Sequence, residues 1–359
     1  MKKTALFILL AIALAAVPIL GACKAEPAPA PTPAPAPEEP IELKFHLFAP
    51  EKSAENVLGY YPYGQAIEEA TKGKVKVTFY PGATLLSPQE AYDGVIAGIA
   101  DMGLCVLTHF PGRFPLCEVF PMPFLGGLLA KERATVSWRV YEKFPEMQAH
   151  FSDVHLLSFF DTKQSYFLSK NPIKTLEDAK GVRIRGFPGE TEQSLTALGF
   201  SVVMMPAPEI YENLQKGVID ATLSAWSMTT GFRLNEVAKY VFDMQHGGTG
   251  FLIPMNLDKW NSLPADIQNQ ITSVSGGTLG AKFGDTVHDK YADECVAKVD
   301  ELGIIYTVPT PEEVARWREV GGTDIWNDWA ARMDAKGLPG REVLDYTIKV
   351  WEEDFGWKH

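Results

Sequence analysis

Residues 181–200 read GVRIRGFPGETEQSLTALGF and predict a strand, a tight turn and a helix. Apolar and cationic side chains alternate over 182–185, which is the period of a half-buried strand. The glycines and the proline of 186–189 predict a turn, and we expect a helix to begin near Thr191. Arg183 and Arg185 lie near the carboxyl end of this strand. A charge is costly to bury without a partner, so the stretch raises the question of whether either arginine holds a ligand.

The rest of the chain continues the alternation of strands and helices. Its pattern predicts strands at 41–48, 74–82, 102–107, 154–160, 165–169, 200–206, 219–226, 247–256 and 304–308. Helices are expected between them, at 54–72, 87–97, 175–181 and 207–217, in one or two long segments from 263 to 303, and in a tail through Trp351. This order is typical of an α/β fold with largely parallel sheets.

Two α/β units joined by more than one crossing of the chain predict two lobes with a ligand cleft between them. We expect lobe I at 41–162 plus 252–300, lobe II at 163–251 plus 301–320, and a helical C-terminal tail at 321–359. In open α/β sheets, ligands bind at the carboxyl ends of the strands. Arg185 lies at such an end, whereas Arg183 lies deeper along the strand and is expected to reach solvent.

The N-terminal segment has the pattern of an export signal. Lys2 and Lys3 precede an apolar run at 5–19, which is too short for a comfortable membrane span, and LGAC follows at 20–23. Leu-Gly-Ala-Cys resembles the bacterial lipobox, in which the cysteine is lipidated. We therefore expect a lipoprotein signal peptide at 1–22 and a lipid on Cys23. A plain signal peptide with a chance cysteine is the alternative.

A proline-rich segment follows the cysteine. Residues 24–40 contain seven prolines in seventeen positions, which excludes a helix or the interior of a sheet. Such linkers favour polyproline II at about 3.1 Å per residue, so this one can reach roughly 50 Å. Residues 23–40 are thus expected to tether the folded part to a membrane and to hold it away from the surface.

The net charge restricts the partners. The chain carries a formal charge of −12, and removal of the signal peptide with its two lysines makes it −14. This acidity argues against nucleic acid and anionic lipid surfaces as partners. An anionic ligand would need a local cationic site in this field. About 320 residues remain after the linker, which suits two domains better than one small core.

Motifs for catalysis and for cofactors are missing from the sequence. We find no GxSxG elbow, no phosphate-binding loop and no histidine spacing for zinc, so we expect no enzyme activity, no cofactor and no metal. Cys105 and Cys117 could form a disulfide in an oxidising compartment, or remain buried free thiols. His46 and His109 fall near strand ends, where each is either a satisfied polar residue or a ligand contact.

Several segments in consistent order resemble one family, the extracytoplasmic solute-binding proteins of tripartite ATP-independent periplasmic (TRAP) transporters, of the C4-dicarboxylate-binding DctP type. The matching segments are AYDGVIAGIADMGLCVLTHFPGRFPLCEVFPMPFL, NPIKTLEDAKGVRIRGFPG, PAPEIYENLQKGVIDATLSAW and MNLDKWNSLPADIQNQI. The resemblance covers about 41–345 and implies a two-lobed periplasmic binding protein fold. It places the family's carboxylate-binding arginine on Arg185, whose planar fork of donors suits a carboxylate.

The sequence also departs from the family's pattern. Some members carry a second arginine where Ser165 stands, although Lys163 could substitute. Asp220 is followed by ATLSAW instead of a polar segment, so we expect a less polar site and a monocarboxylate with an apolar or aromatic body. Trp226 could equally belong to the core. The candidate ligand-binding residues are Arg185, Phe187, Ser224, Trp226, Thr108, Ser165 and Phe251.

The expected function is binding without turnover, in the periplasm or at the cell exterior. The lobes are expected to close by a hinge near 161–165 and 248–253 and to deliver the acid to the membrane subunits of a TRAP transporter. The alternatives are the receptor of an ATP-driven importer, a periplasmic lipoprotein hydrolase, and a structural or adhesion lipoprotein. Turnover of a bound acid would favour the hydrolase, and absence of any ligand would favour the last.

Overall fold

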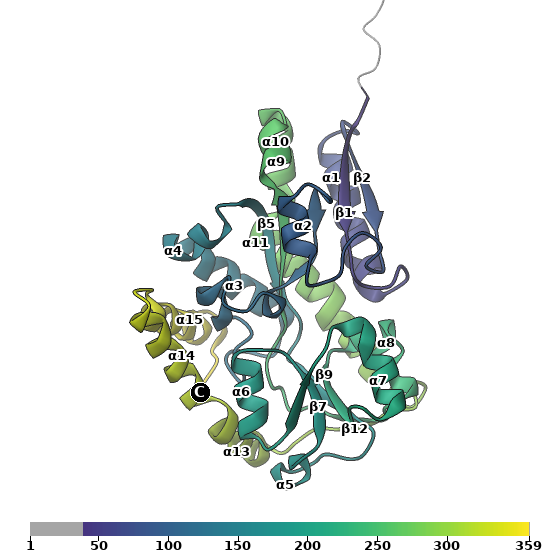
Figure 1. Ribbon diagram of the computed structural model, residues 1–359, viewed down its shortest axis with the longest axis vertical. Coiled ribbons are helices and arrows are strands. Elements are labelled where there is room, and N and C mark those ends of the chain that lie inside the picture. The colour runs from purple at the N-terminus through teal and green to yellow at the C-terminus, as the bar shows by residue number, and fades with distance from the viewer. Residues whose placement is uncertain (1–38, 359) are drawn as a thin grey trace, which may run out of the picture. The chain divides into compact units, whose positions relative to one another are not determined.

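The structure is a computed structural model that describes residues 39–358, in which two mixed β-sheets are each flanked by helices (Figure 1). The expected signal peptide at 1–22, Cys23 and the linker as far as residue 38 lie outside the described residues. Over the described part, the α/β class with two sheets and C-terminal helices is confirmed.

The first sheet has six strands in the order β2–β1–β3–β11–β4, with β5 also paired to β11. β1 runs parallel to β2 and β3, whereas β11 runs antiparallel to β3, β4 and β5. Alternate residues of β1, Leu43 and Phe45, are fully buried, as the alternating pattern predicts. The strands are β1 (Ile41–His46), β2 (Val75–Tyr80), β3 (Met102–Gly103), β4 (Cys105–Val106), β5 (Val154–Asp161) and β11 (Gly250–Asn256).

Helices cover this sheet, and we call the sheet with these helices the first lobe. α3 packs on β5 and on α11, while α1 packs on β2 and α10. The helices are α1 (Tyr61–Ala70), α2 (Ala91–Ile96), α3 (Ala130–Lys143), α4 (Pro145–Gln148), α9 (Leu257–Ser262), α10 (Ala265–Ser273), α11 (Gly276–Phe283) and α12 (Tyr291–Val296).

The second sheet has the strand order β12–β10–β6–β9–β7–β8, and we call it, with its helices, the second lobe. β7 lies between β8 and β9 and runs parallel to both, so its carboxyl end is the kind of edge where ligands bind. The strands are β6 (Tyr166–Ser169), β7 (Arg183–Gly186), β8 (Ser201–Met204), β9 (Ala221–Ser224), β10 (Tyr240–Phe242) and β12 (Ile305–Thr307). The helices are α5 (Leu176–Ala179), α6 (Glu190–Ala197), α7 (Ile210–Lys216) and α8 (Trp226–Gly231).

Two chain segments that pass between the lobes, 162–165 and 243–249, are hydrogen-bonded to each other. The amide of Thr162 donates to the carbonyl of Thr249 at 3.1 Å, and the amide of Thr249 donates to Oγ1 of Thr162 at 2.9 Å. The amide of Ser165 donates to the carbonyl of Gly247 at 2.7 Å. We call 162–165 and 243–249 the crossing segments. They join β5 to β6 and β10 to β11.

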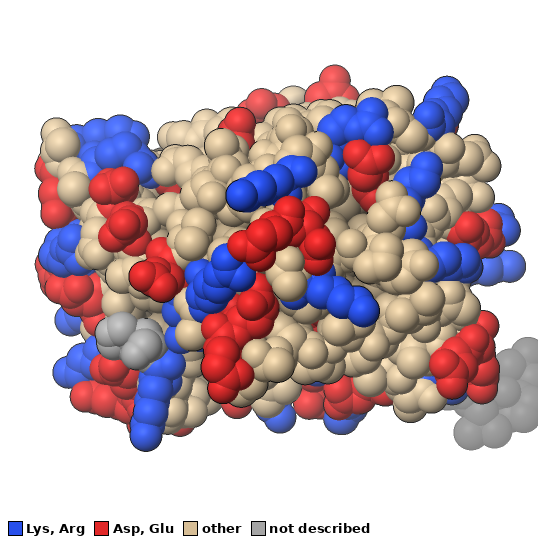
Figure 2. All heavy atoms as spheres, turned by 90° about the horizontal axis from the view of Figure 1, so that it is seen from below, with Lys and Arg blue, Asp and Glu red and all other residues tan. Residues whose placement is uncertain are grey.

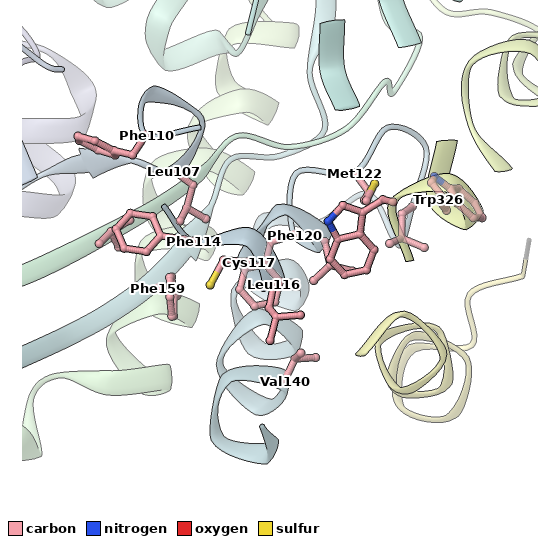
Figure 3. Packing of buried hydrophobic residues seen from close by; sticks show 14 of the residues in the cluster. Leu107, Phe110, Phe114, Leu116, Cys117, Phe120, Met122, Val140, Phe159 and Trp326 are labelled. Atoms are coloured by element: carbon pink, nitrogen blue, oxygen red, sulfur yellow. The ribbon is translucent and has the colours of Figure 1, made fainter. Parts of the chain in front are cut away.

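The C-terminal helices pack against both lobes. α15 contacts α3 of the first lobe, whereas α13 and α14 contact α6 of the second. The indole of Trp326 donates to the carbonyl of Pro123 at 2.7 Å, and Figure 3 shows this residue at the edge of the buried cluster that includes Met122 and Phe120. The tail therefore belongs to the core. Its helices are α13 (Pro311–Gly321), α14 (Thr323–Ala335) and α15 (Gly340–Phe355).

Several details refine the pattern-based expectations. β10 was not predicted, and the strand expected at 219–226 ends at Ser224, because Trp226 begins α8. The helix expected at 87–97 begins only at Ala91, as α2, and the Ser87 hydroxyl donates to Glu90 at 2.6 Å. Of the two possibilities left open for Cys105 and Cys117, the structure has the buried free thiols.

Charged side chains of both signs are interspersed over the face shown in Figure 2. Many of the surface charges form exposed ion pairs, such as Arg183 with Asp220, and such pairs contribute little to stability. Within residues 39–358, no helix is both long and apolar enough to cross a membrane.

Candidate functional site

A cavity of about 50 Å³ lies between the two lobes, with walls from both. Phe48, Val106 and Phe251 come from the first lobe, and Arg185 and Leu223 come from the second. The lining is mainly apolar. It consists of Phe48, Glu55, Val106, His109, Thr162, Ser165, Arg185, Phe187, Ala207, Leu223, Ser224, Ala225, Ser227, Met228, Phe232, Thr249, Phe251 and His288.

Arg185 is the cation of this cavity, and only 1% of its surface is exposed. It lies near the carboxyl end of β7, opposite Val203 and Thr222 on the neighbouring strands. Nε donates to the carbonyl of Met205 at 3.1 Å, but Nη1 is enclosed and has no hydrogen-bond partner among the described residues. No ion pair found within residues 39–358 includes this arginine.

This environment favours an anion. Burial lowers the pKa of Arg185 to about 9, which still leaves the guanidinium charged at neutral pH. An unpaired buried charge costs several kcal/mol, and a carboxylate with two charge-assisted hydrogen bonds offsets that cost. The arrangement therefore suits an acid whose carboxylate reaches Nη1.

Phe187 and His109 stand next to the guanidinium. The centroid of the Phe187 ring lies 3.9 Å from Cζ of Arg185 and 6.3 Å from the centroid of the His109 ring. Burial, and then the charge of Arg185, lower the pKa of His109 to about 4. The imidazole is therefore neutral at physiological pH, and it leaves Arg185 as the anchoring charge on this wall.

Arg183 has a different role from Arg185, although the two are only two positions apart on β7. Its guanidinium is exposed and donates twice to Asp220, from Nε at 2.8 Å and from Nη2 at 2.7 Å. The expectation that Arg183 reaches solvent is confirmed, with the addition of this partner. The strand thus carries one paired surface cation and one unpaired buried cation.

Three further candidates from the sequence also line the cavity. Ser224 shares a hydrogen bond of 2.7 Å with Thr229, and Ser165 lies in a crossing segment. The Phe251 ring stacks on Phe160, with centroids 5.1 Å apart. These residues come from β9, the crossing segment and β11, and the lobe arrangement brings them together with Arg185.

The other two candidates, Trp226 and Thr108, lie outside this lining. Trp226 lines a second cavity of about 150 Å³ and packs on Tyr166 and Tyr306, with centroids 5.0 and 5.9 Å away. It turns away because β9 ends at Ser224 and the chain enters α8. Thr108 lines a separate pocket between 107–121 and 188–191. Lys163 also lines the second cavity, where it pairs with Asp293 at 3.1 Å.

Sequence reasoning missed Glu55, Ser227 and His288, which the structure places in the cavity wall. Burial raises the pKa of Glu55, against the opposing effect of its own backbone amide, Ser227 and Ser53. Burial lowers the pKa of His288 to about 3. No local motif marks these positions, since each is a lone polar residue on a helical segment.

The described residues offer little for catalysis or metal binding. No group of three His, Cys, Asp or Glu side chains within 39–358 is placed to hold a metal ion. Ser194 and His246 form a hydrogen-bonded pair at 2.9 Å, but both are buried and Ser194 donates to the carbonyl of Gly321. Neither residue lines the cavity, so a substrate there does not reach this pair.

Comparison with known families agrees with this geometry. The profile of the family described as bacterial extracellular solute-binding protein, family 7 (DctP), matches residues 54–331. The chain therefore belongs to this family of solute-binding receptors, which are not enzymes, and its fold is that of TRAP-type periplasmic solute-binding proteins. The family resemblance seen in the sequence is confirmed, and family membership supports a periplasmic location.

Similar proteins include two curated relatives and one solved structure. The C4-dicarboxylate-binding periplasmic protein of Rhodobacter capsulatus is 25% identical over 305 residues, which are 84% of this chain and 90% of that protein. The monocarboxylate 2-oxoacid-binding periplasmic protein of a Nostoc species is 27% identical over 319 residues, 85% of this chain and 83% of that protein. The solved structure is a TRAP solute-binding protein from an unidentified marine microbe, specific for aromatic acids and complexed with 3-hydroxybenzoate. It has a TM-score of 0.81 and 25% sequence identity to this chain, and the match covers 88% of this chain and 98% of that chain.

Proposed function

We propose that this receptor binds a small monocarboxylate with an apolar or aromatic body in the cavity at Arg185. The observation that carries the proposal is the buried, unpaired guanidinium of Arg185 in a mainly apolar cavity. The carboxylate accepts from Nη1, and the body of the acid contacts Phe187 and Phe251. Ser165 and Ser224 provide polar contacts at the side.

The apolar lining favours one carboxylate over two. A second carboxylate would need a second cation, and Lys163 already pairs with Asp293 outside this cavity. Related proteins whose ligands are named bind dicarboxylates, 2-oxoacids or aromatic acids. Membership of the family therefore does not identify the ligand.

The size of the cavity further restricts the ligand. A cavity of about 150 Å³ holds benzene, whereas this one encloses about 50 Å³. A compact branched or short acid fits the present conformation, and a ring requires the lobes to separate slightly. We propose that the lobes, 41–162 plus 252–300 and 163–251 plus 301–320, move about the crossing segments, with the tail 321–359 attached to them.

Calorimetric titration of the full-length protein tests the proposal with a panel of acids. Short and branched monocarboxylates and benzoate are expected to bind, whereas succinate and fumarate are expected to bind at least about tenfold more weakly. Tighter binding of the dicarboxylates would overturn the monocarboxylate assignment and leave the receptor function standing. Absence of binding by every acid would overturn both.

The receptor is further proposed to be anchored to the membrane through a lipid on Cys23 and to deliver its acid to the membrane subunits of a TRAP transporter. The LGAC segment and the proline-rich linker support the anchor. Metabolic labelling with an alkyne fatty acid tests it, because Cys23→Ser is expected to abolish labelling and to release the protein from the membrane fraction. Labelling that persists in this variant would contradict the anchor.

Two of the alternatives have distinct readouts. An ATP-driven importer's receptor would support uptake that requires ATP, and a TRAP receptor supports uptake that requires an ion gradient. A hydrolase would release product from a bound acid derivative over hours. The buried Ser194–His246 pair offers no route for that reaction from the cavity.

A further inference from the structure

Two polar side chains of the cavity have no role in holding a carboxylate at Arg185. Glu55 directly precedes the helical turn at Asn56–Tyr60, and His288 lies in the helical segment Gly284–Lys290. Both belong to the first lobe, whereas Arg185 belongs to the second, and all three line the same cavity. The wall that faces the second lobe thus carries polar groups of its own.

The carboxyl group of Glu55 reaches across to the second lobe. A Cβ atom built on Gly231, the last residue of α8, would lie 3.6 Å from Oε2 of Glu55. That oxygen is fully enclosed and has no hydrogen-bond partner within the described part of the chain. An enclosed carboxyl oxygen without a partner loses about 1–3 kcal/mol relative to one that is hydrogen-bonded, so a ligand that supplies the bond gains affinity.

His288 presents a second unmatched atom. Its Nε2 is enclosed and finds no partner in residues 39–358, and its ring stacks on Phe160 at 6.5 Å. Because burial lowers the pKa of His288 to about 3, the imidazole is neutral. A neutral imidazole does not stabilise the ionised carboxylate of Glu55. Burial raises the pKa of Glu55.

We infer that the ligand carries, besides the carboxylate at Arg185, an uncharged hydroxyl group that meets Glu55 and His288, so that the receptor selects hydroxy-monocarboxylates. A hydroxyl can donate to Oε2 of Glu55 and accept from Nε2 of His288 when the neutral imidazole carries its proton on that nitrogen, so it satisfies the two unmatched atoms together. A methyl group would leave both unpaired, and a carbonyl oxygen could only accept. An ammonium group has no lone pair and could not accept from Nε2. This inference rests on the proposed function, because it takes the carboxylate at Arg185 as given.

Matched pairs of acids test the inference by calorimetry. The pairs are butanoate with 3-hydroxybutanoate and 4-hydroxybutanoate, and benzoate with 3-hydroxybenzoate and 4-hydroxybenzoate, with 4-aminobutanoate as the charged comparator. At least one hydroxy acid is expected to bind about tenfold or more tightly than its unsubstituted partner. Glu55→Ala is expected to bring that ratio to about 1–2, while affinity for the unsubstituted acid stays within about threefold.

Two variants serve as controls. Glu51→Ala removes an exposed acid from the same segment and is expected to leave the ratio unchanged. Glu55→Gln keeps a side-chain oxygen acceptor in a group of the same size and is expected to retain most of the ratio. A variant that merely disturbed the fold would weaken both members of a pair equally, so the ratio separates recognition from stability.

The results that would contradict the hydroxyl inference differ from those that would contradict the carboxylate site at Arg185. Equal binding of hydroxylated and unsubstituted acids, a ratio that survives Glu55→Ala, or tighter binding of 4-aminobutanoate would overturn the hydroxyl inference alone. If no acid binds, or if Arg185→Ala changes nothing, the proposed carboxylate site itself is wrong.

Discussion

The guanidinium of Arg185 lies against the face of the Phe187 ring, with Cζ 3.9 Å from the ring centroid. The turn that follows β7 creates this contact, because it returns Phe187 over the arginine before α6 begins at Glu190. The ring covers one side of the cation, while Nη1 remains without a partner in the described residues. The ring therefore both orients the cation and forms part of the apolar wall.

Phe187→Leu is expected to weaken binding of a monocarboxylate by about 2- to 30-fold, because it removes a cation–π contact of about 0.5–2 kcal/mol while it keeps most of the apolar volume. Calorimetric titration with the tightest-binding acid measures the change. Phe232→Leu alters another wall of the cavity and serves as the matched control. Equal losses in the two variants would mean that the stacking on Arg185 has no particular role.

Thr162→Val is expected to lower the free energy of unfolding by about 1–2 kcal/mol. The variant keeps the shape of the side chain but removes the Oγ1 that accepts from the amide of Thr249 at 2.9 Å, between the crossing segments. Urea denaturation measures the loss. Thr135→Val, on the exposed face of α3, is the control and is expected to change stability by less than about 0.5 kcal/mol. Unchanged stability of Thr162→Val would show that the crossing segments do not depend on this bond.

The stability difference between the wild type and His246→Gln is expected to depend on pH. Burial lowers the pKa of His246 to about 3, so the unfolded chain takes up a proton near pH 6.5 that the folded protein does not. The wild type therefore loses about 3 kcal/mol relative to the variant as pH falls from 7 to 4. At pH 7 the variant is the less stable of the two, because it loses the well-aligned bond to Ser194.

Denaturant unfolding of both proteins at several pH values tests this expectation. Comparison of the two proteins cancels the other buried histidines and carboxyl groups, which they share. The difference is expected to stay constant from pH 7 to 9. If the stability difference between the wild type and His246→Gln also stays constant from pH 7 to 4, the imidazole of His246 has the same pKa in the folded protein as in the unfolded chain.

The sequence predicted the elements that carry strong local patterns. Alternation over 182–185 and the following glycines and proline located β7, its turn and α6, and the family resemblance singled out Arg185. Phe187 and Ser224 followed because they lie on the same turn and on the neighbouring strand. These features depend on residues that are close in the chain, so their pattern is visible without the fold.

The rest of the site depends on contacts between distant segments. Trp226 was a candidate for the pocket wall, with the core as the alternative, but β9 ends at Ser224 and the Trp226 side chain lines a different cavity. Glu55 and His288 lie on helical segments, where a lone polar residue has the same pattern as a solvated one. β10 has only three residues, too few for its alternation to stand out from a loop.

The most direct test of the account compares Arg185→Ala with Arg183→Ala. The two arginines lie on the same strand and carry the same charge, but Arg185 is buried and unpaired within the described residues whereas Arg183 is exposed and paired with Asp220. Calorimetric titration with the tightest-binding monocarboxylate is expected to show at least about a tenfold loss of affinity in Arg185→Ala and less than about a twofold change in Arg183→Ala. Unchanged affinity in Arg185→Ala, with the fold intact, would contradict the claim that this cavity holds the carboxylate.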